Sequence, residues 1–324
     1  MTSLAVLGGG AWGTALANVL ARQSVILWAR DRDHVARMQA QRENKRYLPG
    51  VPLAGGVAVT ADMAACAQAD IVLAVIPTQA LRSVLREARA VLKPDVTLIL
   101  CAKGIERGMS AFPSEIAAEE CPAAQIAALS GPSFADDVAR GLPTAVTLAC
   151  ADGAKAEALC AVVGSRTFRP YASADVRGVE IGGAAKNVLA IACGIAEGRG
   201  LGASARAALT TRGFAELSRF GAALGARPET LVGLSGLGDL LLTCGSAQSR
   251  NFSLGLAIGR GAAPAAAIRE RLAEGAWTAP VLVRMARDRG VAMPIAEAVD
   301  AVLAGRLDVG GAIEALLARP YRRE

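Results

Sequence analysis

Hydrophobic positions in the first half of the chain gather in short runs separated by amphipathic stretches and glycine-rich turns. The run at residues 71–76 contains no charged or amide side chain, which is typical of a strand buried on both faces of a sheet. Amphipathic stretches at 14–22 and 79–92 predict helices. This alternation indicates an α/β fold with a Rossmann-type, doubly wound parallel sheet. The strands are expected at residues 4–7, 25–28, 71–76, 96–101, 128–129 and 145–149.

The pattern changes near residues 171–179, where strand-like runs give way to long stretches rich in Ala, Leu and Gly. Such stretches predict a second, mainly α-helical C-terminal domain. We therefore expect a sheet domain at residues 1–177 and a helical domain at 178–324. The C-terminal helices are expected at 182–197, 203–224, 228–234, 250–258, 281–289 and 295–304.

Length and composition agree with this division. The 324 residues exceed what one hydrophobic core usually serves, and 53% of them are hydrophobic. No stretch of about eighteen apolar residues is free of charges. The N-terminus has no basic segment before its short apolar run. We expect a cytoplasmic protein with no membrane span and no signal peptide.

Cysteine, histidine and charge content exclude several classes of function. The seven cysteines form no CxxC pair, so reduced thiols in a cytosolic protein are the simplest interpretation. His34 is the only histidine, which leaves neither a Cys/His metal cluster nor a Ser-His-Asp triad. The net charge of +6 comes from basic residues interspersed with acids, and aromatics are only 4%. This pattern favours anionic small molecules over nucleic acid.

A glycine loop follows the first predicted strand and opens the first predicted helix. Gly8, Gly10 and Gly13 occupy the three positions of GxGxxG. The first glycine permits the tight turn, the second lets backbone approach a pyrophosphate, and the third lets helix and strand pack closely. The helix N-terminus adds N–H donors and partial positive charge. The loop predicts a dinucleotide site at residues 8–13, with Ala11 among them; the alternative is an ordinary glycine-rich turn.

The end of the second predicted strand bears on the choice between the two nicotinamide dinucleotides. An acidic residue there would accept a hydrogen bond from the ribose 2′-OH of NAD. Here Arg30 precedes Asp31, so Arg30 can meet the 2′-phosphate of NADP while Asp31 turns away. We expect NADP(H), with NAD(H) also accepted. The alternative is that Arg30 is a solvated surface charge.

Two lysines are candidates for the chemistry. Lys103 follows the predicted strand at 96–101, at the edge where ligands bind in open α/β sheets. Lys186 lies in a predicted helix with only Gly, Leu and Ala at three and four positions away. An ammonium on such a face needs a partner or its pKa falls, which suits proton transfer to an oxygen. The alternatives are a solvent-facing loop lysine at 103 and a snorkelling lysine at 186.

Polar residues between 239 and 251 indicate how a phosphorylated substrate is held. Asp239 lies in an apolar run, where a carboxylate is costly unless it is paired. It is either a helix N-cap or a partner for Lys186 and a substrate hydroxyl. Ser249 can cap the following helix, where Arg250 and Asn251 can donate to an anion. Any capped helix with a surface arginine would look similar.

Together these segments resemble the bacterial NAD(P)-dependent glycerol-3-phosphate dehydrogenases over nearly the whole chain. The resemblance implies reversible hydride transfer between NAD(P)H and dihydroxyacetone phosphate, giving sn-glycerol 3-phosphate for phospholipid synthesis. It makes 1–177 the dinucleotide-binding domain and 178–324 the substrate and catalytic domain. The similar stretches are GGGAWGTALA (8–17), LWARD (27–31), YLPG (47–50), KGIE (103–106), SGPSFADDVARGLPTAV (130–146), GVEIGGAAKNVLAIACGIAEG (178–198), TRGFAELSRFGAALGA (211–226), GLSGLGDLLLTC (233–244) and SAQSRN (246–251).

The resemblance also implies roles for individual residues. Lys186 is the proton donor and acceptor, Lys103 contacts cofactor and substrate, and Asp239 completes the catalytic group, with Thr243 supporting it. The remaining cofactor contacts implied are Trp12, Arg30, Ala135, Arg250 and Glu274. The remaining substrate contacts implied are Gly131, Ser133, Ser249, Arg250 and Asn251.

Two departures from the family pattern and two alternative functions stay open. Thr78 stands where serine is common, and Trp277 stands where a smaller or basic residue is usual, which bears on Glu274. A β-hydroxyacid or 6-phosphogluconate-type dehydrogenase has a similar pair of domains and a helix lysine. A non-catalytic dinucleotide-binding redox sensor would not need Lys186, Asp239 and Arg250 together. Alanine-rich helices can supply a homodimer interface, but the sequence does not show an oligomeric state.

Overall fold

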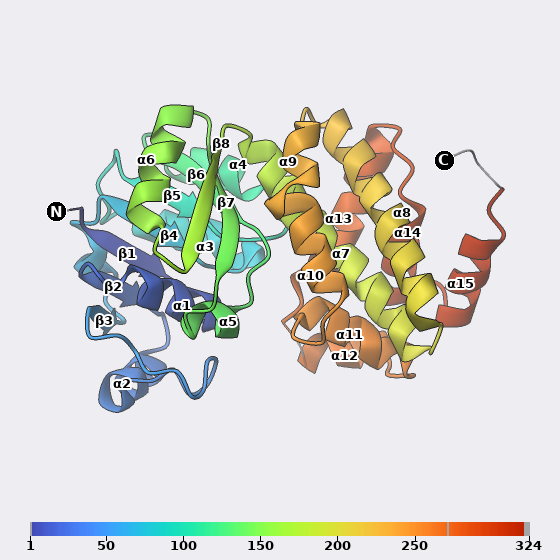
Figure 1. Cartoon of the computed structure of the whole chain (residues 1–324), viewed down its shortest axis with the longest axis horizontal. Helices are drawn as coiled ribbons and strands as arrows, with labels where there is room; N and C mark the ends of the chain where they lie inside the picture. The colour runs from blue at the N-terminus through green and yellow to red at the C-terminus, as the bar shows by residue number, and fades with distance from the viewer. Residues whose placement is uncertain (1, 271, 321–324) are drawn as a thin grey trace. The chain divides into compact units, whose positions relative to one another are not determined.

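The computed structural model describes residues 2–270 and 272–320 (Figure 1). The chain forms two compact units. Unit 1 contains residues 1–102 and 111–179, and unit 2 contains residues 103–110 and 180–324. The domain boundary expected after residue 177 stays a prediction.

A single sheet organises the described part of unit 1, and its eight strands are ordered β3-β2-β1-β4-β5-β6-β7-β8. Neighbouring strands are parallel except β6 and β7, so the expectation of a wholly parallel sheet is wrong at this pair. The connection between them, residues 131–143, contains only the five-residue helix α5. The strands are β1 (Leu4–Leu7), β2 (Val25–Trp28), β3 (Val57–Thr60), β4 (Ile71–Ala74), β5 (Thr97–Leu100), β6 (Gln125–Ser130), β7 (Thr144–Cys150) and β8 (Phe168–Ser173).

Helices connect these strands in the doubly wound manner that the sequence predicts. The predicted helix at 14–22 begins three residues earlier, at Ala11, and the helix predicted at 79–92 ends at Ala88. Strands β3 and β8 were not expected. The helices of unit 1 are α1 (Ala11–Leu20), α2 (Arg32–Gln41), the 3-10 helix η1 (Met63–Cys66), α3 (Thr78–Ala88), α4 (Pro113–Glu120), α5 (Ala135–Ala139) and α6 (Gly153–Val163).

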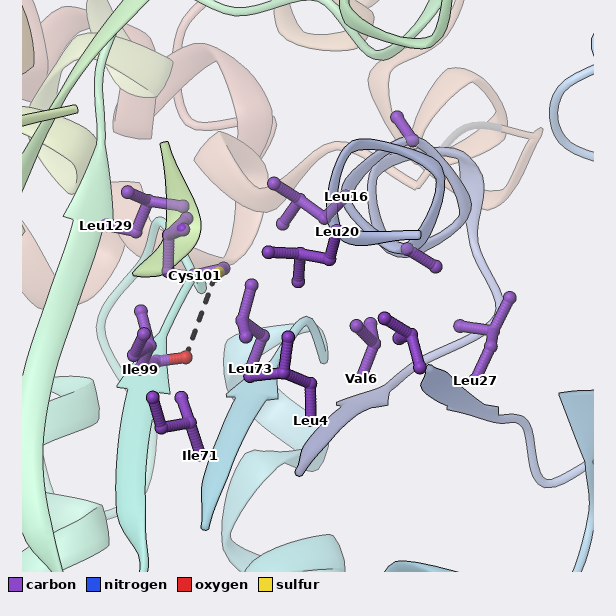
Figure 2. Packing of buried hydrophobic residues seen from close by; sticks show 14 of the residues in the cluster. Leu4, Val6, Leu16, Leu20, Leu27, Ile71, Leu73, Ile99, Cys101 and Leu129 are labelled. Atoms are coloured by element: carbon purple, nitrogen blue, oxygen red, sulfur yellow. Dashed lines mark hydrogen bonds between the residues drawn. The ribbon is translucent and has the colours of Figure 1, made fainter. Parts of the chain in front are cut away.

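The central strands are apolar throughout because both faces of the sheet are covered. Successive side chains of a strand point to opposite faces. Leu4 and Val6 of β1 lie in one buried cluster with Leu16 of α1, and Figure 2 shows this cluster filling the space between α1 and the sheet. Ala5 and Leu7 lie in a second cluster with residues of α3. This two-sided burial explains the unbroken apolar runs in the sequence.

Unit 2 is helical, as predicted. The helix α7 is long and apolar enough to cross a membrane, but its apolar window is entirely buried, as in the core helix of a folded domain. The π-helix η2 lies between α9 and α10. The elements are α7 (Val176–Gly198), α8 (Gly202–Ala223), α9 (Pro228–Val232), η2 (Leu234–Gly238), α10 (Asp239–Cys244), α11 (Arg250–Gly259), α12 (Pro264–Glu270), α13 (Glu274–Asp288), α14 (Pro294–Leu303) and α15 (Val309–Leu317).

Glycines let α7 and α11 pack backbone against backbone. A Cβ on Gly194 of α7 would lie 2.1 Å from the carbonyl oxygen of Phe252, and one on Gly198 would lie 2.9 Å from the Cα of Gly259. From the other side, a Cβ on Gly255 of α11 would lie 2.1 Å from the carbonyl oxygen of Ile191. The spacing of four residues puts both glycines of each helix on one face. This contact fixes α11 against the C-terminal part of α7.

A buried carboxylate joins α8 to the start of α14. Glu216 accepts hydrogen bonds from the backbone N–H groups of Ile295, at 2.8 Å, and Ala296, at 3.3 Å. Burial raises the pKa of Glu216 to about 7, although these two bonds and Arg219 act in the opposite direction. The side chain thus satisfies donors at a helix start that has no side-chain cap of its own.

We predict that Gly13→Ala destabilises the protein more than Gly10→Ala does. A Cβ on Gly13 would lie 1.9 Å from the carbonyl oxygen of Gly8. Overpacking of this kind costs ~1–3 kcal/mol, more than the roughly 1 kcal/mol that better helix propensity returns. A Cβ on Gly10 would meet nothing within 4 Å. Denaturant unfolding measures both variants, and equal stabilities would contradict the close packing of α1 on β1.

Candidate active site

Two lysines share one carboxylate in unit 2. Lys186 Nζ lies 2.6 Å from Asp239 Oδ1, and Lys103 Nζ lies 2.7 Å from Asp239 Oδ2. Each oxygen of the carboxylate therefore accepts from a different ammonium. Of the two interpretations open for Asp239, the structure supports pairing with Lys186, since the N-cap of α10 is Gly238. No acid lies near Lys186 along its own helix, and the partner comes from 53 residues away.

Burial and charge set the protonation of this group. Lys186 is 6% exposed and Asp239 is 1% exposed. Burial lowers the pKa of Lys186 to about 8, with Asp239 opposing that shift and Lys103 adding to it. Burial acts to raise the pKa of Asp239, but the ammoniums of Lys103 and Lys186 outweigh it and hold that pKa below its usual value. The carboxylate is thus ionised, and Lys186 titrates near neutral pH.

Local backbone geometry places Asp239 beside Lys186. Asp239 directly follows the π-helix η2, a type of turn that is often found at functional sites. A Cβ on Gly182 of α7 would lie 2.4 Å from the carbonyl oxygen of Ser235 in η2. Because Gly182 lies one helical turn before Lys186, this close approach brings the start of α10 beside the lysine.

Thr243 lies one turn after Asp239 on α10 and completes the surroundings of Lys186. Its Oγ1 accepts a hydrogen bond from Lys186 Nζ at 2.8 Å and donates to Asp239 Oδ1 at 3.3 Å. The supporting position expected for Thr243 agrees with this geometry. An ammonium has three N–H donors, and the contacts of the described residues occupy two of them. The third N–H is available for an oxygen of a ligand.

Asn187 is a site residue that the sequence analysis missed. Its Nδ2 donates to the carbonyl oxygen of Lys103 at 2.8 Å, and its Oδ1 accepts from Asn251 Nδ2 at 2.8 Å. Asn251 Oδ1 in turn accepts from the backbone N–H of Gly275 at 2.9 Å. This chain of amides joins the Lys103 segment to the starts of α11 and α13. In the sequence, the position of Asn187 next to Lys186 was the only indication that it belongs to this group.

The start of α11 has the form expected of an anion site. Ser249 caps the helix by accepting from the N–H of Phe252 at 3.2 Å. Arg250 is exposed, and its guanidinium has no hydrogen-bond partner among the described residues. Asn251 is buried, and its amide makes the internal bonds given above. Arg250 is therefore the residue here whose donors remain available for a phosphate.

Glu274 begins α13 and is followed by Gly275, which bonds to Asn251. A Cβ on Gly275 would lie 2.5 Å from the carbonyl oxygen of Asn187, so this turn requires glycine. The departure at Trp277 has a local partner, since the guanidinium of Arg107 lies 5.0 Å from the centre of its ring. Such a cation–π contact joins the Lys103 segment to α13.

The glycine loop of unit 1 suits a dinucleotide pyrophosphate. Gly8 has φ +125°, which favours glycine, and a Cβ there would lie 2.2 Å from the carbonyl oxygen of Val75. The N-cap of α1 is Gly10, with no side-chain cap and no acidic residue in the first turn. The first N–H groups of α1 can therefore bind an anion. The space beside Gly10 is open, and glycine has no Cβ that would block an anion from the backbone there. Ala11 and Trp12 lie in this first turn.

The structure separates the roles of Arg30 and Asp31. Asp31 caps α2 by accepting from the N–H of His34 at 3.0 Å, and it pairs with Arg46 at 3.2 Å. The His34 bond is the main cause of the lowered pKa of Asp31. Arg30 is exposed. The carboxylate of Asp31 thus bonds to its own helix start and to Arg46. This agrees with the expectation that Asp31 turns away.

The remaining expected contacts follow β6 in unit 1. Gly131 has φ +146°, and a Cβ there would lie 2.8 Å from the Cα of Val146. Ser133 Oγ donates to the carbonyl oxygen of Gly131 at 3.0 Å. Ala135 begins α5, and its side chain packs on the same core cluster as Trp12. Their roles in ligand binding stay predictions, as do those of the other site residues.

The dinucleotide-binding type of sheet and the glycine loop are features of the nicotinamide-dependent oxidoreductases as a class. Two family models narrow this class. Residues 3–156 match the N-terminus of NAD-dependent glycerol-3-phosphate dehydrogenase, and residues 175–314 match its C-terminus. The chain belongs to the NAD-dependent glycerol-3-phosphate dehydrogenase family, which confirms the resemblance found in the sequence.

Relatives and solved structures agree with the family. A glycerol-3-phosphate dehydrogenase (NAD(P)+) from Azorhizobium caulinodans is 62% identical, covering 99% of this chain and 98% of that protein. One from Methylobacterium radiotolerans is 56% identical, covering 100% and 98%. The crystal structure of glycerol-3-phosphate dehydrogenase from Coxiella burnetii has a TM-score of 0.94 at 39% identity, covering 98% of this chain and 99% of that one. A ketopantoate reductase from Ralstonia eutropha, 17% identical, shares the fold alone.

We predict that Asp239→Asn destabilises the protein increasingly as pH falls below about 8. The lost carboxylate leaves two ammoniums facing a neutral amide, so the pKa of Lys186 falls below the wild-type value of about 8. When the pKa of a lysine is lower in the folded state than in the unfolded state, the unfolded state binds more protons. The free energy of unfolding then decreases as pH falls. Breaking a buried pair costs ~3–5 kcal/mol, and we expect about this loss at pH 6 in denaturant unfolding.

Thr243→Val is the matched control, because it removes a neutral partner of the same ammonium. It should cost less, roughly 1 kcal/mol, with little dependence on pH. A loss in Asp239→Asn that is the same at pH 6 and pH 9 would contradict the shared-carboxylate arrangement.

Proposed function

We propose that this chain is an NAD(P)-dependent sn-glycerol-3-phosphate dehydrogenase that interconverts dihydroxyacetone phosphate and sn-glycerol 3-phosphate. The observation that supports this most is the buried Lys186, which shares Asp239 with Lys103. The family match and the full-length relatives named for this reaction support the choice of substrate. The family match and these relatives also disfavour the two alternatives, a hydroxyacid dehydrogenase and a non-catalytic redox sensor.

The substrate phosphate binds at the start of α11 in this proposal. Arg250 supplies the charged donors, and the helix N-terminus capped by Ser249 adds partial positive charge. Asn251 fixes this helix start through Asn187 and Gly275. Binding energy from the phosphate, remote from the reacting carbon, then positions the ketone.

Lys186 is the general acid of ketone reduction. Two of its N–H groups are held by Asp239 and Thr243, which aims the third at the ketone oxygen. A nicotinamide cofactor, when bound, would supply the hydride. Lys186 would pass a proton to the developing alkoxide. A lysine pKa of about 8 suits transfer in both directions near neutral pH. Lys103 stabilises negative charge at the same oxygen, and Asp239 keeps both lysines oriented.

The cofactor is held by the glycine loop at residues 8–13, with Trp12, Ala135, Lys103, Arg250 and Glu274 as further contacts. NADP(H) is preferred in this proposal, with NAD(H) also accepted. Arg30 is exposed and meets the 2′-phosphate, whereas Asp31 is occupied as the cap of α2. NAD-specific sites have an acidic residue that accepts a hydrogen bond from the ribose 2′-OH. In this proposal Asp31 does not take that role.

The cellular setting follows from the same function. The product is a precursor for phospholipid synthesis, and the enzyme acts in the cytoplasm without binding nucleic acid or spanning a membrane. Its alanine-rich helices supply a homodimer interface.

Consumption of NADPH or NADH by the purified protein, dependent on dihydroxyacetone phosphate, tests the function directly. Absence of that reaction with both cofactors would overturn it.

We predict that Lys186→Ala lowers the turnover of dihydroxyacetone phosphate reduction by at least ~10²-fold, the usual scale of general acid catalysis. Steady-state kinetics with saturating NADPH measure the effect. Lys93→Ala, which removes a surface lysine paired with Asp70, is the control and should keep wild-type turnover. Turnover within a few-fold of wild type in Lys186→Ala would exclude its role as the acid.

We predict that Arg30→Ala raises the KM for NADPH at least ~10-fold and leaves the KM for NADH within about twofold. The 2′-phosphate loses a charge-assisted bidentate contact worth roughly 1.5–3 kcal/mol, which NADH never makes. Parallel titrations of both cofactors give the ratio. Arg37→Ala, on the neighbouring helix α2, is the control. An equal rise for both cofactors would argue against recognition of the 2′-phosphate by Arg30.

A further inference from the structure

The segment at residues 103–110 belongs to the helical unit, although it follows strand β5 in sequence. All of its residues are described, and they form a turn at 107–109 rather than a helix or a strand. The proposed function gives Lys103, at the start of the segment, a role in the reaction. A lysine ammonium is carried on a flexible four-carbon stem. The contacts that fix the backbone of this segment therefore bear on where the Lys103 ammonium lies.

The first part of the segment is held at the site itself. Lys103 Nζ donates to Asp239 Oδ2 at 2.7 Å, and the carbonyl oxygen of Lys103 accepts from Asn187 Nδ2 at 2.8 Å. Ile105, two residues further on, is entirely buried. The turn at 107–109 is exposed, so it has to be fixed by other contacts.

Helix α13 supplies contacts to this outer part of the segment. The Arg107 guanidinium lies 5.0 Å from the centre of the Trp277 ring. Arg284 donates through Nη2 to the carbonyl oxygen of Arg107 at 3.4 Å, and also to Ser110 Oγ. Trp277 and Arg284 are two helical turns apart, which places them on one face of α13. This face of α13 contacts the segment at both Arg107 and Ser110.

The backbone at Ser110 shows why the far end of the segment needs these contacts. Its φ is +57°, in the left-handed region that favours glycine over residues with a side chain. A residue stays in such a conformation only where its surroundings require it. The hydrogen bond from Arg284 to Ser110 Oγ is a contact of that kind. Without Arg284, the backbone at Ser110 can relax to a less strained conformation.

We propose that Trp277 and Arg284 are positioning residues, which hold the segment 103–110 on α13 and thereby keep the Lys103 ammonium on Asp239. Their effect on turnover rests on the proposed function, whereas their effect on the place of Lys103 does not. Trp277 departs from the family pattern, and a smaller or basic residue there would offer Arg107 no aromatic face. The departure thus has a role in holding the segment.

The titration of Lys186 reports where the Lys103 ammonium lies. Burial is the main cause that lowers the pKa of Lys186 to about 8, and the charge of Lys103 lowers it further against the attraction of Asp239. If the Lys103 ammonium leaves Asp239, the repulsion weakens and the whole carboxylate remains for Lys186. Both changes raise the pKa of Lys186. A purely structural role of Trp277 or Arg284 would leave this titration unchanged.

The test compares Trp277→Leu and Arg284→Ala with the wild-type full chain by two readouts. Nuclear magnetic resonance of side-chain-labelled lysines measures the titration midpoint of Lys186, and steady-state kinetics measure kcat and KM for dihydroxyacetone phosphate. Lys103→Met removes the ammonium itself and gives the midpoint for its complete loss. Trp277→Phe keeps an aromatic face, and Arg284→Lys keeps a charged donor. Arg287→Ala is the matched control, because it removes another exposed arginine of α13.

We expect the midpoint of Lys186 to rise in Trp277→Leu and in Arg284→Ala, toward that of Lys103→Met. We also expect kcat to fall roughly 10-fold and KM to stay within about threefold, because a displaced Lys103 no longer stabilises charge that develops in the transition state. Trp277→Phe, Arg284→Lys and Arg287→Ala should keep wild-type values.

An unchanged midpoint in Trp277→Leu or in Arg284→Ala would contradict the role of that residue. An equal rise in Arg287→Ala would overturn the proposal, and so would an unchanged midpoint in Lys103→Met, since Lys103 would then not lie beside Asp239. A raised midpoint with unchanged kcat would overturn the effect on turnover. If the wild-type protein does not reduce dihydroxyacetone phosphate, the proposed function fails, and the midpoints alone still decide whether Trp277 and Arg284 position Lys103.

Discussion

Asp239 is the group around which the helical unit is arranged, because its two oxygens neutralise two ammoniums at once. A buried lysine without a partner would lose its proton or destabilise the fold. Here the carboxylate keeps Lys186 charged, while burial and Lys103 bring its pKa to about 8. The same ion group therefore supports stability and, in the proposed function, proton transfer. Removing the carboxylate would leave neither lysine with the charge or orientation that the reaction needs.

Small residues make this ion group possible. Gly182 lets the π-helix approach α7, and the glycines of α7 and α11 bring those two helices into backbone contact. Asn187 then reaches Asn251, and through it the start of α13. Three segments distant in sequence are thus held to one helix by contacts that a single methyl group would disrupt.

The sequence allowed the class of fold and most of the site to be predicted, for identifiable reasons. Unbroken apolar runs identified the central strands because both sheet faces are covered, and Lys186 stood out because its helical neighbours are apolar. Strand β3 was missed because Val57–Thr60 is short and half exposed, and α10 because its start is a π-helix with no cap signal. The antiparallel β6–β7 pair was missed since local pattern does not fix strand direction.

Side-chain partners were the least predictable feature. The Lys103–Asp239–Lys186 group joins residues up to 136 positions apart, and no local spacing specifies which acid meets which lysine. Asn187 was overlooked because an amide beside a lysine has no distinctive pattern until Lys103 and Asn251 flank it. The family resemblance supplied the candidate residues of the site, whereas the hydrogen bonds among them required the structure.

The titration of Lys186 itself tests this account most directly. Nuclear magnetic resonance of lysines labelled at the side chain, with Lys186 assigned from the spectrum of Lys186→Arg, measures its pKa in the wild-type protein. The account predicts a pKa of about 8, well below the ordinary lysine value of 10.5. Titration near 10.5 would mean that the attraction of Asp239 fully offsets the effect of burial, so that Lys186 does not titrate near neutral pH, and the central claim would be wrong.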